Sequence, residues 1–203
     1  MKQKRILLHT CCAPCSSYVY ELLKDDYKIT PYFFNPNIAP REEFTQRLEE
    51  MRYFSAMKGM PLIVGEYDLP GWTARVRPHR FEGEKSERCF ECYRFRLEGT
   101  YEQAAALDMD QVGTVLSISP HKNAEMINAI GTDLGQRYGI PFLEANFKKQ
   151  EGFKKSSDLS RYYGFYRQDY CGCVYSRMER DRNSEWSQRV MAHREESKSN
   201  SSS

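Results

Sequence analysis

Short apolar segments alternate with helix-like segments along most of this 203-residue chain, and this alternation constrains the fold more than any other feature. Apolar runs bounded by turn residues are typical of buried strands, and they occur at residues 5–10, 29–35, 62–67, 112–119 and 141–147. Apolar residues at steps of three or four, or runs of good helix formers, predict helices at 42–58, 91–107 and 123–138. The predicted fold class is therefore α/β, with a Rossmann-like, mainly parallel sheet flanked by helices.

The chain changes character after Lys148, where it becomes polar, aromatic and helix-like. A chain of 203 residues can bury a substantial core without disulfides, which favours one domain. We predict a single catalytic domain over residues 1–194, made of an α/β core at 1–147 and a helical, aromatic-rich appendage at 148–194. The serine-rich end, 195–203, is predicted to be a disordered tail.

Composition limits the location and the chemistry of the chain. A mean hydropathy of -0.74, with no apolar run approaching about 18 residues, excludes a membrane span. A strand-like segment begins after four residues, which leaves no room for the apolar part of a signal peptide. We therefore expect a cytoplasmic protein with reduced thiols. In that compartment its seven cysteines indicate metal binding or catalysis rather than structural disulfides.

Several unusual segments follow the predicted strands directly. Cys11 and Cys12 come after the first strand, Asn35 to Asn37 after the second, and the segment SISPHKN after the fourth. Ligands of open parallel sheets bind outside the carboxyl ends of the strands. The order of the segments therefore places the chemistry at one rim of the sheet. His9 and His121, together with Asp169 beside the third cysteine cluster, are the candidates for proton transfer.

The cysteines form three clusters with different chemical possibilities. Cys89 and Cys92 form a CxxC at a helix start, where the helix N-terminus stabilises thiolates. With Cys11 and Cys12 they would complete a four-sulfur site for zinc or an iron–sulfur cluster. Cys12 and Cys15 also match a metal-free redox CxxC, although Cys15 is equally well explained as a small buried residue in a first helical turn.

The third cluster is Cys171-Gly172-Cys173, which is too tight to chelate a metal in the usual CxxC manner. Glycine allows the sharp turn that a disulfide here would need, and a strained disulfide is readily reduced. This spacing suits a redox-active pair, and the alternative is two unrelated buried thiols.

Two stretches combine positive charge with aromatic side chains. Residues 75–96 hold seven Lys or Arg against four Glu, and residues 147–182 hold nine against five acids. Cationic groups neutralise phosphates while aromatic faces stack on exposed bases, which predicts an RNA surface across the cysteine clusters. A packed aromatic cluster with a solvated charged face is the alternative interpretation.

Four motifs together identify a family resemblance. The segments LLHTCCAPCS, RCFECYRFRL, SISPHKN and SSDLSRYYGFYRQDYCGCVYS, which span residue 7 to about 176, resemble the QueH-type epoxyqueuosine reductases. The resemblance implies the last step of queuosine synthesis, in which an epoxide at the wobble position of a tRNA anticodon loop loses its oxygen as water and leaves an alkene. It implies a [4Fe–4S] cluster bound by Cys11, Cys12, Cys89 and Cys92, and a redox-active disulfide between Cys171 and Cys173.

Four cysteine ligands would leave no open iron to activate the epoxide oxygen. We therefore hypothesise that Cys11 or Cys12 is labile, or bridges to a second metal ion nearby. An external electron donor, which the sequence does not identify, would reset the redox pair. The alternative functions are a zinc-stabilised RNA-binding module without catalysis and a metal-free thiol oxidoreductase.

Overall fold

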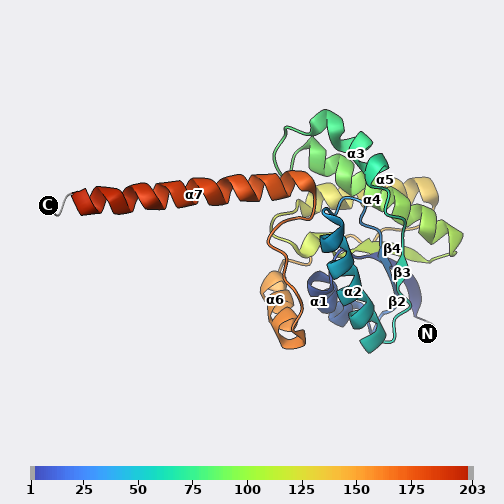
Figure 1. Cartoon of the computed structure of the whole chain (residues 1–203). Helices are drawn as coiled ribbons and strands as arrows, with labels where there is room; N and C mark the ends of the chain where they lie inside the picture. Colours follow the sequence, from blue (N-terminus) through green and yellow to red (C-terminus); the bar gives the residue numbers. More distant parts are fainter. Residues whose placement is uncertain (1–2, 201–203) are drawn as a thin grey trace.

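A parallel four-stranded sheet forms the centre of the molecule, in the strand order β3-β2-β1-β4 (Figure 1). The computed structural model describes the backbone of residues 3–200 and the side chains of residues 3–189. The strands are β1 (Lys4–His9), β2 (Tyr27–Phe33), β3 (Ile63–Val64) and β4 (Gln111–Thr114). Central strand β1 pairs with β2 and β4 in parallel. The predicted α/β class with a mainly parallel sheet is confirmed.

Helices cover both faces of this sheet. They are α1 (Ala13–Leu23), α2 (Arg41–Met57), α3 (Leu69–Val76), α4 (Glu87–Ala106), α5 (Ala124–Tyr138), α6 (Gly152–Tyr163) and α7 (Val174–Asn200), with 3-10 turns η1 (Arg77–His79) and η2 (Val115–Ile118). Helix α1 packs against α2, α6 and β2, whereas α4 packs against α3, α5 and β1. The predicted helices at 42–58, 91–107 and 123–138 correspond to α2, α4 and α5.

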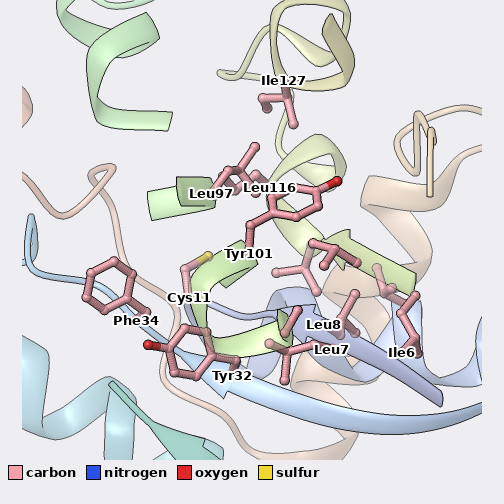
Figure 2. Packing of buried hydrophobic residues seen from close by; sticks show 14 of the residues in the cluster. Ile6, Leu7, Leu8, Cys11, Tyr32, Phe34, Leu97, Tyr101, Leu116 and Ile127 are labelled. Carbon is pink, nitrogen blue, oxygen red and sulfur yellow. The ribbon is translucent and has the colours of Figure 1, made fainter. Parts of the chain in front are cut away.

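The core lies on both sides of β1, whose Ile6, Leu7 and Leu8 are all buried. A strand buried on both faces has a continuous apolar run rather than an alternating one, and these residues form such a run. Figure 2 shows them in the larger core cluster together with Tyr101 and Cys11. Cys11 therefore joins the hydrophobic core directly to the rim of the sheet.

Three predicted strands are shorter than the sequence indicates: the strand expected at 62–67 is only β3, Ile63–Val64. The strand expected at 112–119 ends at Thr114, whose hydroxyl accepts a hydrogen bond from Leu116 N and starts η2. The segment expected as a strand at 141–147 makes only one isolated bridge, between Phe142 and Val112. Apolar composition is the same in a full strand, in a 3-10 turn and in a segment with a single bridge, so it could not distinguish them.

Helix α7 runs from the body of the molecule into the surroundings (Figure 1). Its backbone is helical through residues 195–200, where the sequence analysis expects disorder, and residues 201–203 lie outside the described residues. Every side chain that is described between residues 181 and 189 is exposed, so no apolar stripe draws this stretch back onto the body. Nowhere in the described part of the chain is a helix both long and apolar enough to cross a membrane.

Candidate active site

A cavity of about 750 Å³ opens where β1 ends, and four cysteines line it: Cys11, Cys15, Cys89 and Cys171. The fourth strand's loop contributes Ser119, His121 and Lys122. Asn35 lies behind the cavity wall, where its amide donates to Thr10 O at 2.8 Å. The convergence at one rim that the strand order predicts is therefore present, and the three cysteine clusters meet there.

The first thiol group consists of Cys11, Cys12 and Cys15, whose sulfur atoms all lie within 4.8 Å of one another. Hydrogen bonds from the Cys12 and Cys15 thiols hold the pKa of Cys11 well below its usual range. Burial raises the pKa of Cys12 to about 12, and the bond to Cys11 raises that of Cys15 as well. The group therefore stabilises one thiolate with two neighbouring S–H donors, which is a suitable arrangement for a metal ion.

Helix α1 and the segment before α7 hold this first group in place. Cys12 is the N-cap residue of α1, and Cys15 follows in its first turn, so the three-residue spacing brings the two thiols to one side. Gln168 donates from Nε2 to Cys12 Sγ at 3.2 Å, while its own buried Oε1 has no hydrogen-bond partner among the described residues. The amide therefore fixes the position of one sulfur.

The second thiol group, Cys89 and Cys92, lies in the first turns of α4. Lys85 N donates to Cys89 Sγ at 3.3 Å. Burial is the main cause that raises the pKa of Cys89 to about 11, and the nearby charges of Cys171 and Cys92 add to it. Cys92 is buried below the cavity in a cluster with Trp72, Val76 and Cys173. This group thus lies beside the third cysteine cluster.

The third cluster is a tight turn in which Gly172 has a φ of +119°, a conformation that favours glycine. Both Cys171 and Cys173 are free thiols here. Cys171 faces the cavity, whereas Cys173 is buried and its sulfur accepts from Ser176 N at 3.4 Å. Burial raises the pKa of Cys173 to about 12. One thiol of the pair is therefore open to a ligand and the other is shielded.

A buried ion pair from α2 anchors this turn. Arg47 donates from Nε to Glu43 at 2.6 Å and from its terminal nitrogens to the carbonyls of Cys171 and Tyr170, at 3.3 and 3.4 Å. Ala39 N donates to Gly172 O at 2.9 Å. Three consecutive carbonyls are thus held by residues from a distant part of the sequence, which fixes the direction of Cys171.

Cations surround the thiols. Although burial opposes its charge, Lys122 has a raised pKa because the Cys171, Cys11 and Cys15 thiolates lie nearby. Arg47 and Arg96 likewise have pKa values raised by neighbouring thiolates despite burial. Buried cations thus lie beside the sulfur atoms of the cavity, which suits an anionic ligand or a metal–thiolate centre.

The proton-transfer candidates differ in their environments. His9 is fully buried and does not line the cavity; burial lowers its pKa to about 3. Its ring nitrogens contact Thr114 Oγ1 at 2.9 Å and Phe34 O at 3.1 Å, so it is a structural residue. Asp169 lines the cavity and is paired with Arg180 at 2.6 Å. His121 is exposed at the cavity edge.

The predicted site residues are thus all near one cavity, but the cysteines group differently from the predicted set of Cys11, Cys12, Cys89 and Cys92. Among the residues whose side chains are described, the one group of three or more potential ligands within 4.8 Å contains Cys15 and lacks Cys89 and Cys92. The spacing CxxC at 12–15 signalled Cys15 in the sequence. Arg47, Arg96 and Trp72 were missed, because no motif marks a buried side chain that reaches the site from another element.

The comparisons with known proteins decide the family. A family model described as "Epoxyqueuosine reductase QueH" matches residues 6–179. The chain belongs to the QueH family. It is 38% identical over 177 residues to the epoxyqueuosine reductase QueH of Streptococcus pyogenes serotype M1, covering 84% of this chain and 69% of that protein. It is 35% identical over 181 residues to the QueH of Thermotoga maritima, covering 86% and 91%.

Solved structures share the fold of this QueH-family chain at low sequence identity. The U34-tRNA thiolase NcsA from Methanococcus maripaludis, solved with its [4Fe-4S] cluster, has a TM-score of 0.57 at 10% identity, over 87% of this chain and 62% of that one. A predicted tRNA methyltransferase subunit from Methanocaldococcus jannaschii has a TM-score of 0.52 at 12% identity, over 75% and 76%. These likenesses establish the α/β fold, and the QueH family establishes an oxidoreductase acting on tRNA.

Proposed function

We propose that the thiol-lined cavity is the place where this chain reduces epoxyqueuosine to queuosine at the wobble position of a tRNA anticodon loop. The observation that carries this proposal is the convergence of three cysteine clusters, far apart in the sequence, on one cavity of a QueH-family chain. A volume of about 750 Å³ is within the range of small-molecule sites, so it can admit a nucleoside. We further propose that the protein acts in the cytoplasm, where thiols stay reduced.

The donor set of the cavity fits a [4Fe–4S] cluster. Soft thiolates are the ligands that such clusters take, and buried cations next to the sulfurs would offset the negative charge of the loaded site. We propose Cys11, Cys12, Cys89 and Cys92 as the ligands. Cys15 is the competing thiol, because its sulfur lies within 4.8 Å of the first two. A fifth thiol is compatible with the hypothesis of a second metal ion near Cys11 and Cys12.

The reaction removes an oxygen atom and needs two electrons and two protons. We propose that both C–O bonds of the epoxide break, that an alkene forms, and that the oxygen leaves as water. Oxidation of the Cys171 and Cys173 thiols to a disulfide supplies two electrons and two protons, so the step balances. A cluster held by the four proposed ligands would supply one-electron chemistry at the site. An external reductant then restores the dithiol.

Positive and aromatic residues around the cavity support RNA as the substrate. Arg167, Arg180, Arg182 and Lys122 line it, and the half-exposed ring of Phe153 lies at the same wall. Cationic side chains can neutralise the phosphates of the anticodon loop, while an exposed ring can stack on a base that leaves the loop.

Anaerobic iron and sulfide analysis combined with turnover on tRNA bearing the epoxide tests the proposal. We expect about four iron and four sulfide ions per chain and conversion of the epoxide to the alkene. Cys171→Ser is expected to abolish turnover but retain the brown chromophore, whereas Cys89→Ser loses both. Cys15→Ser is the matched control from the first thiol group and is expected to retain the iron.

Four outcomes would contradict parts of this proposal. A colourless protein with stoichiometric zinc and no turnover would indicate a zinc-stabilised RNA-binding module. Turnover without any metal would indicate a thiol oxidoreductase. Full activity of Cys171→Ser would exclude the redox pair, and loss of iron in Cys15→Ser would move Cys15 into the ligand set.

A further inference from the structure

Arg96 is a buried cation that no carboxylate neutralises among the residues with described side chains. It lies on α4, one turn after Cys92, and only 1% of it is exposed. Its hydrogen bond of ordinary geometry goes from Nη2 to Asn35 Oδ1 at 2.6 Å, and its buried Nε has no partner in the described part of the chain. By contrast, buried Arg47 pairs with Glu43.

A guanidinium in this position needs a negative charge, because burying an unpaired ion is costly. The cysteine sulfur atoms are the nearby groups that can carry this charge. Cys92 lies one turn before Arg96 on α4, so the two side chains lie on the same side of the helix, and Cys92 is itself buried. A metal-bound thiolate at Cys92 would therefore supply the charge that Arg96 lacks.

Trp72 supplies a second orphaned donor to the same sulfur. Its side chain is 1% exposed, it packs in the cluster that contains Cys92, and its indole N–H has no partner of ordinary geometry. Donors from two different helices, α3 and α4, thus lie beside the Cys92 sulfur. A thiolate or a metal-bound sulfur accepts hydrogen bonds from such donors more strongly than the weakly accepting sulfur of a neutral thiol.

We propose that Arg96, assisted by Trp72, is a positioning residue that provides the counter-charge of the thiolate centre and so favours binding of a metal ion or metal–sulfur group through Cys92 and Cys11. This inference rests on the proposed metal–thiolate site and adds residues that do not themselves bind the metal. Asn35, which receives the Arg96 hydrogen bond and donates to Thr10 O, holds the guanidinium at the end of β2.

Anaerobic titration of the metal-free, reduced protein with Co²⁺ tests this inference through the sulfur-to-cobalt charge-transfer absorbance. Arg96→Gln keeps a donor for Asn35 but removes the charge, and we expect it to bind Co²⁺ roughly 10- to 100-fold more weakly, the usual effect of losing a residue that supports metal ligands. Arg96→Lys keeps the charge and is expected to stay within about threefold of wild type, well below that loss. Arg94→Gln is the matched control, because Arg94 lies on the same helix and pairs with Glu98 and Asp133.

Trp72→Phe removes a single N–H with little change of shape, and we expect about tenfold weaker Co²⁺ binding. It keeps the inference testable if the Arg96 variants fail to fold by circular dichroism. An unchanged Co²⁺ affinity in Arg96→Gln would overturn the inference; where that variant fails to fold, an unchanged affinity in Trp72→Phe would do so. An equal loss of affinity in Arg96→Lys and Arg96→Gln would also overturn it. So would a wild-type protein that forms no cobalt–thiolate complex. Epoxide turnover is measured separately. Turnover by a protein whose variants all bind Co²⁺ equally well contradicts only this inference. Weaker Co²⁺ binding in the expected variants, without turnover by the wild type, contradicts only the proposed function.

Discussion

At the residue scale, the site depends on buried charges whose partners come from distant parts of the chain. Arg47 of α2 is 1% exposed and connects Glu43 to the backbone of the Cys171 turn. Glu43 also accepts a hydrogen bond from the Tyr166 hydroxyl at 3.0 Å. The ion pair therefore belongs to a network in which each member orients the next, and removing Arg47 leaves the buried Glu43 carboxylate without its cation.

Replacing Arg47 by Met is expected to lower the free energy of unfolding by about 3–5 kcal/mol, because it leaves the Glu43 carboxylate buried and unpaired. Urea denaturation of the metal-free protein measures this loss. Arg52→Met, which breaks the exposed pair with Glu49 on the same helix, is expected to cost less than about 1 kcal/mol. A similar, small loss in both variants would show that the network does not stabilise the turn.

At the element scale, the loops and helices at the carboxyl ends of the strands build the cavity. Helix α6 packs along α1, and Ser156 donates to Pro14 O at 2.8 Å. This contact joins the appendage to the helix that carries Cys12 and Cys15. At the start of α6, Gly152 approaches the backbone so closely that an added Cβ would lie 1.8 Å from Phe147 O. The docking of α6 therefore requires glycine at this position.

We expect Gly152→Ala to destabilise the protein by about 1–3 kcal/mol, because the main chain has to move to make room for the methyl group. Thermal or urea unfolding measures this change. Gly83→Ala is the control: Gly83 is exposed and an added Cβ meets nothing within 4 Å, so its effect should be within about 0.5 kcal/mol. An α6 that tolerates alanine without loss would contradict the close packing.

Helices were predictable from the sequence where the spacing of apolar residues agrees with capping residues at both ends. Helix α5 is an example, since Asn123 caps it through Glu125 N and Met126 N and Gly139 ends it with a φ of +68°. Helix α3 (Leu69–Val76) was not predicted, because eight residues give too little periodicity. The strand at 141–147 was overestimated, because a single parallel bridge and a full strand share the same apolar composition.

At the scale of the whole molecule, the parallel order of the strands brings the three cysteine clusters to one rim. That rim was predictable, because strand order and the rule for ligand sites in open sheets do not depend on side-chain detail. The grouping of thiols was not, since it depends on rotamers and on the N-terminus of α1. Cys15 therefore joins Cys11 and Cys12, and the cations Arg47 and Arg96 complete the site from the opposite faces of the sheet.

We propose that the Cys171 and Cys173 pair donates the two electrons that reduce the epoxide. A single-turnover experiment under anaerobic conditions, with the loaded protein reduced beforehand and no external reductant present, tests it most directly. Thiol alkylation and peptide mass spectrometry count the disulfides, and nucleoside analysis of the tRNA counts the alkenes. We expect one Cys171–Cys173 disulfide for each alkene formed. Alkene formation with both thiols still free would contradict it.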